Sequence, residues 1–179
     1  MRKICSSILK MLGWKIDKKV NLPPKCVICV APHTSNWDLI LGEIIYTAMG
    51  EKANFLIKKS WFVFPFNIIF NALGGIPVDR SKKTSLTEQM AEEFGKRDKF
   101  QLAITPEGTR KKAEDWKKGF YYIALAANVP IVIVILDYST KTVTFDSIFH
   151  PTGDAENDIK EIKSHYKNAK GRHPEKFTI

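Results

Sequence analysis

The sequence lacks any long hydrophobic run. No apolar stretch among its 179 residues approaches the roughly 20 residues that a membrane-spanning helix needs. The amino-terminal segment carries Arg2, Lys3 and Lys10 but neither a long apolar core nor a cleavage site, so we expect no secretory signal peptide. Any association with a membrane is therefore expected to be peripheral.

Cysteine is also scarce. Three cysteines, an odd number, do not suggest a disulfide framework and fit a reducing compartment. Cys26 and Cys29 form a C-x-x-C pair, but they lie inside a predicted strand and no second pair completes a zinc site. We interpret both as buried thiols. Because His150, His165 and His173 have no ligand spacing either, we expect no metal.

Acidic residues are outnumbered by basic ones. The chain has 28 lysines and arginines against 19 aspartates and glutamates, a formal net charge of +9. Such an excess indicates an anionic partner, which is a membrane surface, a nucleic acid or a phosphorylated substrate. A nucleic-acid binder often shows a basic stripe with interleaved aromatic residues. Here the bases are spread out, with one concentration at the amino terminus, so nucleic acid is not the expected partner.

What the sequence does contain is enough apolar material for the core of one domain. Hydrophobic residues make up 44% of the chain and aromatic residues 11%, which argues against disorder. Apolar runs that predict strands alternate with segments that predict helices. This alternation predicts an α/β fold with a mixed, mostly parallel sheet flanked by helices. In such sheets the functional site lies beyond the carboxyl ends of the strands.

Residues 1–20 are predicted to form an amphipathic helix, and residues 21–179 the main domain. Isoleucine or leucine recurs every four residues from Ile4 to Ile16, and the segment contains six basic residues but only one acidic residue. A basic amphipathic helix can lie in the interface of an anionic membrane. It can equally pack on its own domain and leave a solvated basic face, and the segment alone does not decide between the two.

Three further elements are predicted from local pattern. A helix is expected to begin at Ser81 or Thr84 and to run to about Asp98. Residues 141–145 alternate between apolar and polar side chains, which suits a strand at the edge of the sheet. Residues 155–168 are predicted to form a helix, followed by a basic end without a clear pattern.

The first polar turn of interest runs from His33 to Asp38, between a predicted strand and a helix predicted over residues 37–49. On one continuous helix, residues five apart point roughly 140° from each other and could not touch. If His33 lies on the loop and Ser35 or Asn36 caps the helix, Asp38 falls in the first turn, where the macrodipole stabilises an anion. Its carboxylate can then reach back to the imidazole. The alternative is that both residues merely support the turn.

Two more polar turns offer groups that hold anions and hydroxyls. Arg80 follows a short extended segment, and residues 107–110 follow a strand predicted at residues 100–104. Arginine holds phosphate through a planar fork of donors, and Gly108 lets the backbone approach a ligand closely. Glu107 could accept hydrogen bonds from hydroxyls or fix an arginine. The set suits a substrate whose phosphate is clamped while its hydroxyl is presented to His33 as the general base.

The sequence at this point resembles the glycerolipid acyltransferases of the 1-acylglycerol-3-phosphate acyltransferase type. The segment from His33 to Asp38 matches the H-x-x-x-x-D motif of that family. Residues 74–80 resemble its second block, residues 106–110 match its third, and residues 129–132 resemble its fourth. Each motif alone is short, but four of them in order are specific. No motif ties the first 20 or the last 40 residues to the family.

The resemblance implies a reaction. His33 would remove the proton from the acceptor hydroxyl, and Asp38 would orient His33 and stabilise its cation. The hydroxyl oxygen would attack the thioester of an acyl-CoA or an acyl-carrier protein, which serves as co-substrate, and no cofactor is implied. Because no acyl-enzyme is required, Ser35 need not be a nucleophile. The residues implied to bind the substrate are Arg80, Glu107, Gly108, Thr109 and Arg110.

The resemblance also implies a setting. The expected acceptor is 1-acylglycerol-3-phosphate, with other lysophospholipids and acylated amino-acid lipids as alternatives, and the expected process is phospholipid biosynthesis. The expected partners are an anionic membrane surface, the lysophospholipid acceptor and the acyl thioester donor. The lack of an export signal and the cytosolic thioester donors indicate the cytoplasmic face of a membrane as the expected location. From the residues themselves, the most aromatic stretch, 61–70, would cover the core, line an acyl-chain groove or dip into the membrane. Core is the expectation, and the other two do not exclude it.

Two readings compete with acyl transfer. A hydrolase would use Ser35, His33 and Asp38, but the sequence has no G-x-S-x-G elbow. A non-catalytic protein that binds lipid or nucleic acid would use the net charge alone. In that protein the lysines would matter, while His33 and Asp38 would be dispensable.

Overall fold

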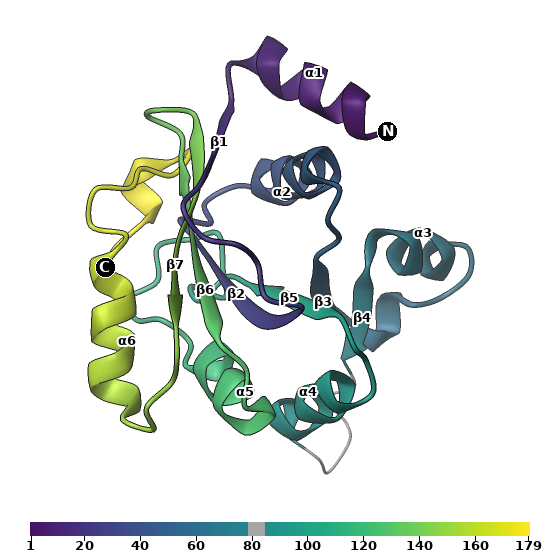
Figure 1. The fold of residues 1–179 in the computed structure, drawn as a ribbon, viewed down its shortest axis with the longest axis vertical. Coiled ribbons are helices and arrows are strands. Elements are labelled where there is room, and N and C mark those ends of the chain that lie inside the picture. The colour runs from purple at the N-terminus through teal and green to yellow at the C-terminus, as the bar shows by residue number, and fades with distance from the viewer. Residues whose placement is uncertain (79–84) are drawn as a thin grey trace.

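The computed structural model describes residues 1–78 and 85–179, and in it a single sheet lies between two layers of helices (Figure 1). The elements in chain order are α1 (Arg2–Leu12), β1 (Lys15–Lys18), β2 (Lys25–Ala31), α2 (Trp37–Met49), β3 (Asn54–Lys58), η1 (Lys59–Trp61), α3 (Phe66–Leu73), β4 (Gly75–Val78), α4 (Leu86–Gly95), β5 (Phe100–Ile104), α5 (Gly119–Ala127), β6 (Ile131–Asp137), β7 (Thr142–Phe149), α6 (Ala155–Ser164) and η2 (Pro174–Lys176).

The sheet has the strand order β1-β7-β6-β2-β5-β3-β4. Its pairs are parallel except for β6 with β7, which run antiparallel. The central strand β2 pairs in parallel with β5 on one side and with β6 on the other. The predicted α/β fold with a mixed, mostly parallel sheet is therefore confirmed, and so are the strand at 100–104 and the helix at 37–49.

The central strands are buried on both faces and divide their side chains between two cores. Along β2, Val27 and Cys29 enter the core beneath α4, α5 and α6, whereas Cys26 and Ile28 enter the core beneath α1 and α2. Figure 1 shows these two helical layers on opposite sides of the sheet. Continuous apolar sequence is required on such strands because successive side chains point to opposite faces. The sheet is thereby fixed from both sides, which holds its strand ends in place.

The amino-terminal helix is shorter than predicted. It ends at Leu12 because Gly13 takes a left-handed conformation, with φ of 76°, and donates its N–H to the carbonyls of Leu9 and Lys10, as glycine commonly does after a helix. The following residues form β1, which pairs in parallel with β7. The expectation of a helix through residue 20 is therefore wrong in extent. The expectation that residues 141–145 form an edge strand is also wrong, because β7 lies between β1 and β6.

The start of α4 also differs from expectation. The predicted caps, Ser81 and Thr84, lie outside the described residues. The observed cap is Ser85, whose hydroxyl accepts the Glu88 N–H while the Glu88 carboxylate accepts the Ser85 N–H, a reciprocal capping box. The helix ends at Gly95, short of the predicted end, and α6 likewise ends early, at Ser164.

The aromatic stretch at 61–70 lies on the surface. Trp61 is 62% exposed, Phe64 81% and Ile68 60%, and α3 contributes no buried residue. The expectation that this stretch covers the core is therefore wrong, because most of its large apolar side chains face outward. Among the described residues, no helix is both long enough and apolar enough to cross a membrane.

Candidate active site

The site is assembled by three neighbouring parallel strands. In the order β6-β2-β5, each strand is followed directly by a polar turn. His33 follows β2, Glu107 follows β5 and Tyr138 follows β6. Because the carboxyl ends of parallel strands meet at one edge of a sheet, turns distant in sequence are brought into contact. The His33 and Glu107 turns are joined directly, because the His33 N–H donates to Glu107 Oε1 at 2.8 Å.

Asp38 organises the first of these turns. It lies in the first turn of α2 and is only 7% exposed. Its Oδ2 accepts the backbone N–H of Thr34 at 2.8 Å and that of Ser35 at 2.9 Å, and it lies 3.2 Å from His33 Nδ1. The carboxylate thus reaches back from the helix to the imidazole, as the spacing of five residues predicts.

This arrangement fixes the charge of Asp38 and the free nitrogen of His33. Burial alone would raise the pKa of Asp38, but hydrogen bonds from His33, Tyr138 and Ser35 outweigh it, so the pKa is lowered. The carboxylate is therefore ionised at neutral pH and favours a proton on Nδ1. The other ring nitrogen, Nε2, is left as the acceptor in the neutral imidazole. The His33 side chain keeps 18% of its surface exposed.

The predicted caps of α2 have other roles. Asn36 is the N-cap residue by position but makes no side-chain cap. Its Oδ1 instead accepts a hydrogen bond from Arg110 Nη1. The Ser35 hydroxyl accepts the N–H of Trp37 at 3.2 Å, so Ser35 supports the start of the helix. Arg110 therefore ties the third family motif to the first.

Glu107 is buried, with 4% of its surface exposed. Its Oε1 accepts the backbone N–H of His33 at 2.8 Å, so it positions the backbone of the turn. Its Oε2 has no hydrogen-bond partner among the described residues. Burial raises the pKa of Glu107, against the opposing effect of the His33 N–H. Because this second oxygen is buried, the expectation that Glu107 accepts hydrogen bonds from hydroxyls stays a prediction.

The remaining predicted residues lie on the same loop or outside the described chain. Gly108 has φ of 64°, a backbone conformation that favours glycine. A Cβ added there would also lie only 3.0 Å from the Lys117 side chain, so any other residue would be strained in its backbone and crowded at its side chain. The Thr109 hydroxyl accepts the N–H of Lys111 at 3.2 Å. Arg80 is outside the described residues.

Sequence reasoning missed Tyr138. Its hydroxyl donates to Asp38 Oδ1 at 2.6 Å, and its position directly after β6, beside β2, is the signal that could have pointed to it. A tyrosine at the carboxyl end of a buried strand is placed where functional side chains gather.

The carboxy-terminal tail was missed as well. The N–H of His173 donates to Thr34 Oγ1 at 3.1 Å, and the Arg172 guanidinium carbon lies 5.4 Å from the centre of the Trp37 ring. The basic end, which the sequence left without a pattern, therefore packs against the turn that carries His33.

The C-x-x-C pair lies in the interior, and the part of the chain that the structure describes has no cluster of metal ligands. Within it, no group of three or more His, Cys, Asp or Glu side chains could hold a metal ion. Cys26 and Cys29 are free and buried, and burial raises the pKa of each thiol to about 12. Both therefore stay protonated, and the interpretation of them as buried thiols is confirmed.

Comparison with known proteins identifies the class. Residues 14–137 match the family model described as Acyltransferase. The chain is 33% identical over 145 residues to the 1-acyl-sn-glycerol-3-phosphate acyltransferase of Saccharomyces cerevisiae, a match that covers 75% of this chain and 46% of that protein. It is 32% identical over 133 residues to the human 1-acyl-sn-glycerol-3-phosphate acyltransferase beta, which covers 68% of this chain and 46% of the human protein.

A solved structure shares the fold. The crystal structure of the 1-acyl-sn-glycerophosphate acyltransferase PlsC from Thermotoga maritima superposes with a TM-score of 0.65 at 18% identity, over 93% of this chain and 75% of that one. The chain belongs to the glycerolipid acyltransferase family. It spans about half the length of the curated relatives it matches.

The packing of the tail on the His33 turn predicts the effect of a small substitution. A Cβ added at Gly171 would lie 2.7 Å from Thr34 Oγ1 and 2.8 Å from its Cγ2, and Thr34 is 2% exposed. We expect Gly171→Ala to lower the free energy of unfolding by about 1–3 kcal/mol through overpacking, measured by urea denaturation.

The matched control is Gly95→Ala. A Cβ added at Gly95, the last residue of α4, would meet nothing within 4 Å, so stability should stay equal or rise, since alanine favours a helix. Equal stability of Gly171→Ala and wild type would contradict the packing of the tail on Thr34.

Proposed function

We propose that the chain transfers a fatty acyl group from an acyl thioester to the hydroxyl of a lysophospholipid, with 1-acylglycerol-3-phosphate as the acceptor. The observation that carries this proposal is the Asp38 carboxylate beside His33 Nδ1, 3.2 Å away, at the carboxyl edge of the sheet. That pair equips Nε2 to take a proton from an acceptor hydroxyl. The relatives, which are 1-acyl-sn-glycerol-3-phosphate acyltransferases, favour the same acceptor.

The reaction follows from this geometry. His33 Nε2 takes the hydroxyl proton as the acceptor oxygen attacks the thioester carbonyl carbon. The resulting imidazolium is stabilised by the ionised Asp38. When the tetrahedral intermediate collapses, the C–S bond breaks and the imidazolium returns its proton to the thiolate. The products are the new oxygen ester and a free thiol, and His33 is restored without an acyl-enzyme.

The acceptor's phosphate would meet cations from the second and third family motifs. Arg110 is held against the His33 turn through Asn36, and four exposed lysines follow it between residues 111 and 118. We assign Arg80 to the same role from the family motif. We assign Glu107 to the acceptor's glycerol from the family motif as well, and Gly108 and Thr109 would shape the loop. The donor is an acyl-CoA or an acyl-carrier protein.

The transfer reaction predicts acceptor-dependent thiol release. Purified protein given acyl-CoA and lysophosphatidate should release free thiol, and His33→Ala should lower the rate by roughly 10²–10⁴-fold, the usual loss when a general base is removed. A thiol-reactive dye measures the rate, and acyl-carrier protein is tried as the second donor.

The matched control is His165→Ala. His165 Nδ1 lies 2.7 Å from Asp146 Oδ2, which is the same pair of groups away from the catalytic turn, so this variant should keep the wild-type rate. Release that needs no acceptor would favour a hydrolase. Transfer that survives His33→Ala would refute His33 as the base.

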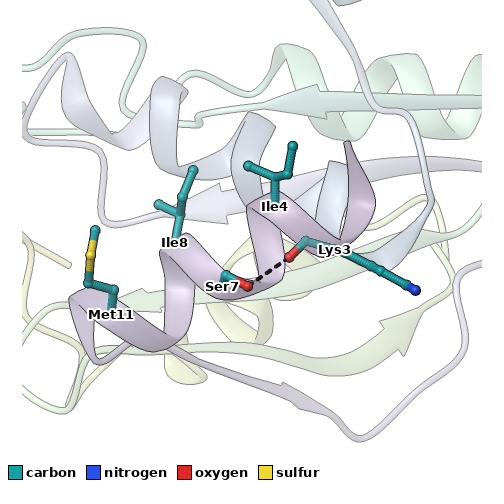
Figure 2. A pocket seen from close by; sticks show the side chains of 5 residues that line it. All are labelled: Lys3, Ile4, Ser7, Ile8 and Met11. Atoms are coloured by element: carbon teal, nitrogen blue, oxygen red, sulfur yellow. Dashed lines mark hydrogen bonds between the residues drawn. The ribbon is translucent and has the colours of Figure 1, made fainter.

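We propose further that the chain binds the surface of an anionic membrane through α1 and through residues 61–70. Leu9 anchors α1 in the core, with 4% of its surface exposed, whereas Ile4 is 64% and Met11 79% exposed. Figure 2 shows Ile4, Ile8 and Met11 lining a hollow along α1, with Lys3 at its edge. An apolar helix face bordered by lysine suits a lipid interface that carries negative charge.

This second proposal predicts a loss of vesicle binding. Replacing Ile4 and Met11 together with serine should weaken binding to phosphatidylglycerol-containing vesicles by about tenfold or more, because each apolar side chain contributes about 1.5–3 kcal/mol when buried. Co-sedimentation measures the binding. Leu125→Ser is the control, since Leu125 is 40% exposed but lies on α5, in the opposite helical layer. If binding is unchanged, α1 is not the membrane contact.

A further inference from the structure

Tyr138 stands apart from the residues that the family motifs supply. It follows β6, outside the segment of the fourth motif, and its hydroxyl donates to Asp38 Oδ1 at 2.6 Å. The two oxygens of Asp38 are thus divided: Oδ2 faces Thr34, Ser35 and His33, while Oδ1 faces Tyr138. We propose that Tyr138 is a positioning residue that acts on the transfer reaction through Asp38. This inference rests on the proposed function.

The carboxylate needs such a second support. A carboxyl group rotates about its bond to Cβ, and such a torsion is broad and soft. Asp38 is 7% exposed, so an Oδ1 without Tyr138 would be a buried acceptor deprived of this partner, which is unfavourable. The group would turn or shift to recover a partner. The Oδ2 that faces His33 Nδ1 would move with it, and the imidazole would lose its orientation.

Tyr138 is itself held in place from both ends of the chain. Its backbone N–H donates to the carbonyl of Lys170 at 2.8 Å, and its ring meets Trp14 edge to face with ring centres 5.0 Å apart. Burial and the adjacent Asp38 raise the pKa of Tyr138, so its hydroxyl keeps the proton that it donates. The support is therefore rigid and remains a donor across the neutral pH range.

The test compares Tyr138→Phe with Tyr121→Phe. Tyr121 makes an equivalent bond elsewhere, because its hydroxyl donates to Asp158 Oδ2 at 2.7 Å. Both variants lose one tyrosine–aspartate hydrogen bond. In the thiol-release assay Tyr138→Phe should lower kcat by roughly tenfold, with KM for lysophosphatidate within about twofold, since an oriented base is used in the transition state. Tyr121→Phe should keep the wild-type kcat.

A double variant shows whether Tyr138 acts through Asp38. In an Asp38→Ala background, adding Tyr138→Phe should lower kcat no further, because residues that act as a unit are not additive. An additional tenfold loss in that background would overturn the inference, and so would a wild-type kcat in the single Tyr138→Phe variant.

Amide hydrogen exchange tests the inference without activity. The N–H groups of Thr34 and Ser35 donate to Asp38, so they should exchange faster in Tyr138→Phe than in Tyr121→Phe. Equal exchange in the two variants would overturn the positioning role. If wild-type protein transfers no acyl group to any acceptor, the proposed function fails, while the exchange comparison still decides the role of Tyr138.

Discussion

The hydrogen bonds that converge on Asp38 are the interaction on which the rest of the site depends. One carboxylate accepts from two backbone N–H groups of its own turn and from the Tyr138 hydroxyl, and it lies 3.2 Å from His33 Nδ1. Without these donors, burial of the carboxylate would favour its neutral form. With them, the charge is kept beside the imidazole, where a developing imidazolium needs it.

The two buried acidic residues of the site show how nearby hydrogen-bond donors determine whether a carboxyl group is charged. Asp38 and Glu107 are both more than nine-tenths buried, yet the pKa of Asp38 is lowered and that of Glu107 is raised. The difference lies in the hydrogen bonds, because Glu107 accepts the His33 N–H through one oxygen while its other oxygen has no partner among the described residues. Asp38 is held ionised beside His33, whereas Glu107 keeps one buried oxygen without a hydrogen-bond partner among the described residues.

The features that could be predicted from the sequence depend on patterns among neighbouring residues. The continuous apolar runs of β2 and β5, the helix that follows His33 and the return of Asp38 to the imidazole all follow from spacing within a few residues. The end of α1 at Gly13 is also a local signal. Ile16 nevertheless continues the apolar repeat of four residues, so the sequence pattern does not show that the helix gives way to a strand.

What could not be predicted depends on pairing between distant segments. Tyr138 meets Asp38 across 100 residues because β6 lies beside β2, and His173 meets Thr34 across 139 because the tail packs on the His33 turn.

The central claim is that Asp38 fixes the proton of neutral His33 on Nδ1 and leaves Nε2 free to act as a base. Nitrogen chemical shifts of the imidazole, recorded by NMR on ¹⁵N-histidine-labelled protein at a pH where His33 is neutral, distinguish the two tautomers directly. The account predicts that His33 carries its proton on Nδ1, and that this preference is lost in Asp38→Ala. A proton on Nε2 in the wild-type protein would contradict the account, because the nitrogen needed to accept the substrate proton would already be occupied.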